Sequence, residues 1–116
     1  MAGMHELAIT EDILRIAVTH GERVDAKRIM DINVVIGDLS SVVDDSVQFY
    51  FDFLSPDTLA AGAKLHFRRI AARLRCRQCG LEFEPQSMEW HCPRCQALGG
   101  EVIAGQELYV ESIEVA

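Results

Sequence analysis

All four cysteines of this 116-residue chain lie in one segment, as two Cys-x-x-Cys pairs. Cys76 and Cys79 form the first pair, Cys92 and Cys95 form the second, and twelve residues separate the pairs. One tight backbone turn can direct both sulfurs of such a pair toward a single point. Two turns together supply the tetrahedral set of thiolates that Zn²⁺ favours in structural sites. The spacing therefore predicts a four-cysteine zinc site.

Other chemistries also use paired cysteines. A redox-active Cys-x-x-Cys motif, two disulfides and an iron–sulfur cluster are the alternatives to zinc. Two matched pairs within one short segment count against all three. A closed set of four thiolates has no open coordination position, so it cannot activate water. We therefore expect a structural zinc ion, with regulation by thiol exchange or oxidation as the alternative role.

A second candidate metal site lies near the amino terminus, at Met4-His5-Glu6. A histidine beside the start of a chain can bind a metal through its imidazole, the terminal amine and deprotonated backbone amides. Such nitrogen-rich, square-planar sites suit Ni²⁺ or Cu²⁺. On chemistry alone this signal is weak, because a lone histidine near a terminus is usually a solvated residue.

The remaining histidines give weaker indications. His20 suits the negative end of a helix dipole, and His66 falls on the polar side of an expected strand. His91 directly precedes Cys92, and four roles are open to it. It is either a solvated residue, a spare zinc ligand, a group that orients a zinc ligand, or a ligand to a metal held at the amino terminus. The sequence contains no phosphate-binding glycine loop, no Gly-x-Ser-x-Gly elbow and no His-Glu-x-x-His motif. We therefore expect a protein that is not an enzyme.

Length and composition predict one folded unit, because the chain has 116 residues of which 49 % are apolar. No apolar run is long enough to span a membrane and no secretory leader is present, so we expect a cytoplasmic protein. The net charge of −7 would repel nucleic acid on average. Six basic residues nevertheless fall between positions 64 and 77. We interpret them as a solvated strand face that also compensates the thiolates, with docking of an acidic partner as the alternative.

Two helices are expected from apolar residues at helical spacing. The first covers residues 5–20, and Gly21 is a typical stop signal. The second ends at Leu54, because Pro56 restricts the residue before it. Its start is expected at residues 41–44, which resemble a capping box, or at Asp44 as the cap itself.

Three strands are expected from alternating apolar residues. The first covers residues 30–36, with Met30 and every second residue after it facing the core. The second covers residues 64–71, where Ile70 is out of phase with Leu65 and Phe67 and indicates a bulge or a twist. The third covers residues 107–115 and changes phase near Glu111 or Ser112.

These elements predict an α/β (α+β) fold in which two helices pack on a three-stranded mixed sheet. The cysteine segment is inserted between the second and third strands, so we expect it to form a separate zinc-ribbon module. The predicted division is an α/β domain made of residues 4–72 plus 107–116 and a zinc-binding domain of residues 73–106.

Several of these stretches together resemble the HypA family of nickel-insertion accessory proteins for [NiFe]-hydrogenase maturation, including its HybF relatives. The likeness covers residues 4–116, and the order and spacing of its motifs are specific. The residues that carry it are Met4-His5-Glu6 leading into Leu7-Ala8-Ile9, Ile36-Gly37-Asp38-Leu39-Ser40, the two cysteine pairs and the closing stretch from Leu108 to Val115.

The resemblance implies a small metallochaperone that exchanges Ni²⁺ with a partner GTPase and delivers it to the hydrogenase large subunit. It implies that nickel is held at the amino-terminal motif, with His5 as the imidazole ligand, Glu6 acting mainly through its backbone nitrogen and Met4 through its own backbone nitrogen. It also implies that the four cysteines bind zinc. Family members occur as monomers or as a homodimer, and some relatives also serve urease.

The chain departs from the family pattern at its start. In the family the methionine of this motif is the first residue and its free amine binds nickel, whereas three residues precede Met4 here. We expect that these residues are an addition or that translation starts at Met4. The nitrogen of Met4 is an amide in the longer chain, and an amide must lose a proton to bind metal. We therefore predict weaker nickel binding by the longer form.

Two other functions compete with nickel delivery. A zinc-ribbon protein that binds nucleic acid or acts as a regulator would use the basic segment, but the net charge and the lack of interleaved aromatic residues argue against it. A thiol oxidoreductase would use Cys-x-x-Cys chemistry, and stoichiometric, tightly held zinc would oppose it. We expect no binding of nucleic acid or membranes.

Overall fold

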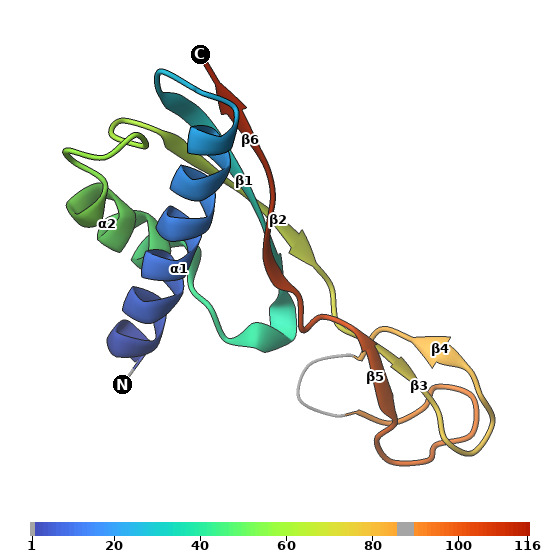
Figure 1. The fold of residues 1–116 in the computed structure, drawn as a ribbon. Coiled ribbons are helices and arrows are strands. Elements are labelled where there is room, and N and C mark those ends of the chain that lie inside the picture. Colours follow the sequence, from blue (N-terminus) through green and yellow to red (C-terminus); the bar gives the residue numbers. More distant parts are fainter. Residues whose placement is uncertain (1, 86–89) are drawn as a thin grey trace.

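Helices lie on one face of a three-stranded sheet, and a second small sheet projects from its end (Figure 1). The computed structural model describes residues 2–85 and 90–116. The elements, in chain order, are α1 (Ala2–Arg23), β1 (Ile29–Gly37), the 3-10 helix η1 (Asp38–Ser40), α2 (Asp44–Leu54), β2 (Lys64–Ile70), β3 (Arg73–Arg75), β4 (Glu82–Phe83), β5 (Glu101–Ala104) and β6 (Leu108–Val115).

The larger sheet has the strand order β2-β1-β6 and confirms the predicted mixed topology. Strands β1 and β2 are parallel, while β1 and β6 are antiparallel. Parallel neighbours need a crossover connection, and the segment that contains η1 and α2 provides it. Both helices lie on the same face of this sheet (Figure 1). The predicted fold of two helices on a three-stranded mixed sheet is therefore confirmed.

The core lies between this sheet and the helices. Apolar side chains from α1, α2 and the strands fill it, and several of them are fully buried. Its buried members are Ile13, Ala17, Ile29, Ile32, Val34, Ile36, Val42, Val47, Phe51, Ala60, Ala63 and Leu65.

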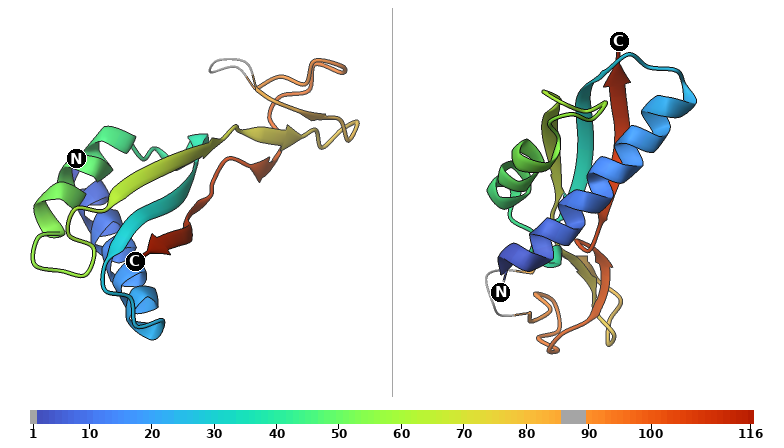
Figure 2. Two further views of the ribbon diagram at one scale, coloured as in Figure 1. Left: turned by 90° about the horizontal axis from the view of Figure 1, so that it is seen from above. Right: turned by 60° about the vertical axis from the view of Figure 1, so that its left-hand side comes forward.

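The second sheet has the order β4-β3-β5 and contains both cysteine pairs at its margin. Its own small core consists of Leu74, Cys76, Phe83 and Cys92. The molecule is elongated, at 55 × 30 × 15 Å, and this module occupies one end of it (Figures 1 and 2). The module therefore has a small core of its own, separate from the main core.

Backbone contacts attach the module to the end of β1. The N–H of Gly37 donates to the carbonyl of Glu107 at 2.7 Å, and the N–H of Leu39 donates to the carbonyl of Gly105 at 2.7 Å. A Cβ at position 37 would lie 2.1 Å from the carbonyl carbon and oxygen of Gly105. Glycine at position 37 is therefore required by the close approach of two backbones.

Gly21 does not end the first helix, so that prediction is wrong. Helix α1 runs from Ala2 to Arg23 and is longer at both ends than expected. A Cβ at Gly21 would lie 2.8 Å from the side chain of Leu59, so the glycine permits close packing inside the helix. Asp25, with a φ of 53°, takes the left-handed conformation that follows the helix end.

The predicted caps of α2 are also wrong. Val43 is the N-cap residue and makes no side-chain cap, while Asp44 is the first helical residue. Ser41 adopts the left-handed conformation as the residue that ends η1, so its side chain does not begin α2. The short 3-10 helix before α2 was not visible in the pattern of apolar residues.

The strand predictions are partly confirmed. Glu111 has no partner between the pairs Asn33–Ser112 and Val34–Val110, so the predicted phase change of the last strand is confirmed. Strand β1 has a second irregularity at Met30, which is 40 % exposed instead of inward, while Ile29 takes the core position. The predicted bulge at Ile70 is wrong, because β2 pairs with β1 without a register shift.

Candidate metal centre

The two cysteine pairs meet at one point. The four Sγ atoms of Cys76, Cys79, Cys92 and Cys95 all lie within 4.8 Å of one another. The Sγ atoms of Cys76 and Cys95 are 3.5 Å apart, and those of Cys79 and Cys92 are 3.6 Å apart. A tetrahedral zinc ion with Zn–S bonds of about 2.3 Å would separate its sulfurs by about 3.8 Å. The sulfurs thus have nearly the spacing of a tetrahedral thiolate site.

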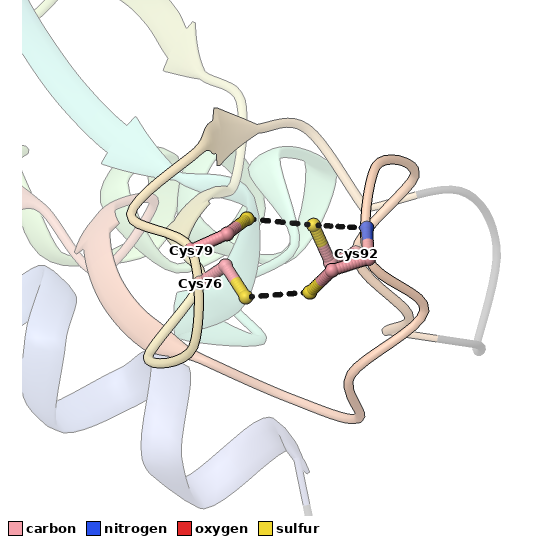
Figure 3. A group of neighbouring side chains, drawn as sticks. Cys76, Cys79 and Cys92 are labelled. Atoms are coloured by element: carbon pink, nitrogen blue, oxygen red, sulfur yellow. Dashed lines mark hydrogen bonds between the residues drawn. The ribbon is translucent and has the colours of Figure 1, made fainter.

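The backbone around each pair directs N–H groups at sulfur. The N–H of Gln78 points at the Sγ of Cys76 at 3.4 Å, and the N–H of Arg94 points at the Sγ of Cys92 at 3.4 Å. Figure 3 shows Cys76 and Cys79 on one loop facing Cys92 on the other. Such contacts stabilise negative charge on sulfur, so both loops are suited to thiolates.

The thiol pKa values indicate that the four groups do not ionise independently. The backbone N–H of Leu81 and the guanidinium of Arg94 lower the pKa of Cys79 to about 6. A backbone N–H of Cys79 lowers the pKa of Cys76. At Cys95 the N–H of Ala97 lowers the pKa, but the neighbouring thiols outweigh it and raise the pKa to about 12. Four adjacent sulfurs therefore need a cation before all can be thiolates.

Arg94 was missed by the sequence analysis. Its guanidinium donates to the carbonyl of Cys79 at 2.9 Å, while its backbone N–H points at the Sγ of Cys92. The residue thus joins the two cysteine loops and brings a positive charge beside the sulfurs. Its position inside the second Cys-x-x-Cys motif was the only signal available from the sequence.

Most of the basic segment is neutralised within the molecule. Arg68 pairs with Glu111 at 2.8 Å, and Arg69 pairs with Asp44 at 2.7 Å. Arg73 and Arg75 lie near carboxylates of the module at 3.3–3.7 Å. The structure therefore favours the interpretation of this segment as solvated, ion-paired strand faces over a surface for an acidic partner.

The amino-terminal motif belongs to the first turns of α1. His5 is exposed, whereas Glu6 is fully buried. One carboxylate oxygen of Glu6, Oε2, accepts a hydrogen bond from the N–H of Val43 at 2.9 Å. The other oxygen, Oε1, is buried without a hydrogen-bond partner in the part of the chain that the structure describes. The imidazole of His5 is therefore in contact with solvent, whereas the carboxylate of Glu6 is in the protein interior.

Glu6 supplies a cap for α2 from another helix. In a capping box the glutamate at the third helical position bonds back to the N–H of the N-cap residue. Here the N-cap is Val43 and the third helical position is Ser46, which cannot do this. The carboxylate of Glu6 makes that bond instead and lies near the positive end of the α2 dipole. No local sequence pattern reveals a cap that comes from a distant residue.

The other histidines lie apart from the cysteines or on the surface. His66 bonds to Asp31 at 2.7 Å across β2 and β1, and this bond lowers the pKa of Asp31. His91 is exposed and its backbone pairs with Leu98 inside the module. The module lies apart from the amino terminus in Figure 1 and in the left view of Figure 2. Within one chain, His91 is therefore not positioned beside the amino-terminal motif.

Fold and site together define a class: a small α/β protein that carries a four-cysteine metal site on a separate module. No helix within residues 2–85 and 90–116 is long and apolar enough to cross a membrane. A sequence model of the family described as "Hydrogenase/urease nickel incorporation, metallochaperone, hypA" matches residues 4–115. The chain belongs to this family.

Curated relatives support the family assignment over nearly the whole chain. The chain is 51 % identical over 112 residues to a hydrogenase maturation factor HypA of Dehalococcoides mccartyi, covering 97 % of this chain and 94 % of the relative. It is 40 % identical over 116 residues to a hydrogenase maturation factor HypA of Caldanaerobacter subterraneus, covering 97 % and 99 %. The relatives are thus named as maturation factors.

Solved structures show the same fold. The solution structure of the Ni metallochaperone HypA from Helicobacter pylori superimposes with a TM-score of 0.65 at 20 % identity, covering 95 % of this chain and 96 % of that one. A second structure, described as the solution structure of HypA protein, gives a TM-score of 0.73 at 22 % identity, with 97 % of each chain covered.

Proposed function

We propose that this protein binds Ni²⁺ at Met4-His5-Glu6 and delivers it for maturation of a [NiFe]-hydrogenase. The observation that carries the proposal is the family match, which begins at Met4, together with the exposure of His5 at the start of α1. An exposed imidazole is free to bind a metal that must later be released. Nickel is cargo here, so we further propose that the protein is not an enzyme.

The backbone nitrogens of the motif complete the proposed ligand set. Met4 and Glu6 contribute their backbone nitrogens, and each of these that is an amide must lose its proton to bind nickel. The amide of Glu6 lies within α1, whose geometry uses amide protons for hydrogen bonds along the helix. In the longer chain, where α1 begins at Ala2, nickel binding therefore opens the first turn of α1. The side chain of Glu6 keeps its bond to Val43 and limits the opening to the residues before it.

We propose that Cys76, Cys79, Cys92 and Cys95 hold a structural Zn²⁺. The fit of their spacing to a tetrahedral thiolate site supports this assignment. Bound zinc would supply folding energy to the module, whose own core is small. In this proposal residues 73–106 form the zinc-binding domain, and residues 4–72 plus 107–116 form the nickel-binding domain.

The proposed partners are a nickel-delivery GTPase and the large subunit of a [NiFe]-hydrogenase. Membership of a family described by hydrogenase and urease nickel incorporation supports this choice of machinery. Thiolate ligands for zinc suit a compartment that keeps thiols reduced, so we propose that the protein acts in the cytoplasm.

Calorimetric titration of the zinc-loaded protein with Ni²⁺ tests the proposal. We expect one nickel site per chain in a protein that begins at Met4, and its loss in His5→Ala while zinc stays bound. The chain that begins at Met1 should bind nickel more weakly, because its Met4 nitrogen is an amide. His20→Ala is the matched control, since His20 is exposed at the other end of the same helix.

Three results would contradict the proposal. Equal nickel binding by the wild-type protein and His5→Ala would place the site elsewhere in the chain. Absence of nickel binding by both proteins would remove nickel as the cargo. Release of zinc during the titration would show that nickel enters the cysteine site instead of the amino-terminal motif.

A further inference from the structure

Helix α2 presents two phenylalanine side chains to solvent. Phe49 is 69 % exposed and Phe53 is 77 % exposed. They are four residues apart, so they lie on the same face of the helix one turn after the other. Phe51 and Val47 of the same helix are fully buried in the core. The helix is thus apolar on its outer face as well as on its inner face.

One of these two phenylalanines contacts a neighbouring ring. Phe49 and Tyr50 pack edge to face, with ring centroids 5.5 Å apart and an interplanar angle of 76°. Exposed apolar side chains that lie together, such as Phe49 and Phe53, mark interaction surfaces, because removing apolar surface from water is favourable. Aromatic side chains, phenylalanine included, are enriched at the cores of protein interfaces. We call Phe49 and Phe53 the aromatic pair.

The segment of chain that contains the aromatic pair carries acidic residues and no basic ones. The thirty-five residues from Ile29 to Ala63 contain six aspartates and no Lys, Arg, His or Glu. Asp45, Asp52 and Asp57 are exposed and lie on α2 or in the turn that follows it. Within residues 2–85 and 90–116 none of these three forms a salt bridge. The aromatic pair therefore has an acidic border.

We propose that the aromatic pair is the docking site for an amphipathic helix of a partner protein, whose apolar face is bordered by Lys and Arg side chains. Charge complementarity selects a basic partner, because the uncompensated aspartates attract cations and repel acidic surfaces. The rings pack against the apolar face of that helix and anchor the complex. The proposal depends on neither metal, so it stands or falls separately from nickel binding.

A second copy of this chain is a poorer occupant. Four arginines of its basic segment already pair with carboxylates of their own chain, and they are Arg68, Arg69, Arg73 and Arg75.

Helix α2 also lies away from the cysteine module, at the other end of the molecule (Figures 1 and 2). A partner bound to α2 therefore leaves the module uncovered.

Titration of the zinc-loaded full chain with a synthetic amphipathic helical peptide of Leu and Lys tests the proposal. Calorimetry gives the affinity, and two-dimensional amide NMR spectra locate the site. We expect saturable binding with shifts centred on residues 45–57. Replacing both rings, by Phe49→Ala and Phe53→Ala together, should weaken binding by about tenfold or more. A peptide of Leu and Glu should not bind.

Leu98→Ala is the matched control, because Leu98 is 78 % exposed but lies in the module. It should leave the affinity unchanged, and both variants should keep the NMR spectrum of the folded protein. Failure of the Leu–Lys peptide to bind, equal binding by the double variant, or shifts spread over the whole surface would overturn the proposal. Sedimentation that shows a dimer abolished by the double variant would overturn it too, since the occupant would then be a second copy.

Discussion

Replacement of Glu6 tests the link between the amino-terminal motif and α2. Its carboxylate is fully buried and accepts the N–H of Val43 at 2.9 Å, at the positive end of the helix dipole. Loss of a helix cap costs about 0.5–2 kcal/mol, and removal of one buried methylene adds about 0.8 kcal/mol. We therefore expect Glu6→Ala to lower the free energy of unfolding by about 1–3 kcal/mol.

Glu6→Gln separates charge from shape. The amide oxygen can still accept the N–H of Val43, but the negative charge near the dipole is lost. We expect a loss of about 1 kcal/mol in the free energy of unfolding. Because Gln keeps the backbone nitrogen, nickel affinity should fall much less in Glu6→Gln than in His5→Ala.

Urea unfolding of the zinc-loaded protein, followed by circular dichroism, measures these changes. Hydrogen exchange of the Val43 amide gives a local measurement, and this amide should exchange faster in both variants. Glu11→Ala is the control, since Glu11 is exposed on the same helix and should change stability by less than about 0.5 kcal/mol. If Glu6→Ala is no less stable than Glu11→Ala, and Val43 exchanges at the wild-type rate, the capping role is refuted.

Three further predictions concern the backbone, the metal and pH. Gly37→Ala should destabilise the protein by about 3 kcal/mol in urea unfolding because its Cβ meets backbone at 2.1 Å. Gly62→Ala, with a φ of 78° in open space, should cost only about 1–2 kcal/mol, and equal costs would contradict this account. Chelation of zinc should collapse the NMR dispersion of the module, including Leu74, while signals of the main core persist; loss of both together would show one cooperative unit. His66→Ala should raise the pKa of Asp31 toward its ordinary value in a carbon-13 titration. Because the pKa of Asp31 is lower in the folded protein, this pair stabilises the protein at pH values above the ordinary carboxylate pKa. The stabilisation is lost as the pH falls through the pKa that Asp31 has in the folded protein. An unchanged pKa of Asp31 in the variant would exclude the bond.

Local patterns allowed most of the elements to be predicted from the sequence. Period-two alternation located β1 and β6, and helical spacing located both helices. The phase change at Glu111 was predictable because one extra residue switches every following side chain to the other face. Errors fell where a distant contact decides the outcome. Gly21 lies inside the helix with Leu59 packed close to it, and in the sequence such a glycine looks like one that ends a helix.

The cysteine site was also predictable, because two Cys-x-x-Cys turns carry most of their geometry locally. Their convergence still depended on tertiary structure, since the two pairs belong to separate loops that meet only in the folded chain. Arg94 illustrates the difference: its place beside Cys95 is local, but its bond to the carbonyl of Cys79 exists only after the loops meet.

The sequence by itself determined the order of the elements, the four cysteines of the candidate metal centre and the position of His5 near the chain start. These features depend on spacing along the chain, which folding does not alter. Tertiary structure alone decided that Glu6 turns inward to cap α2 while His5 stays exposed. It also decided that Arg68 and Arg69 pair with carboxylates and that the side chains of Phe49 and Phe53 are exposed. The physical reason is that burial and charge pairing are set by residues distant in sequence, and only the folded chain brings them together.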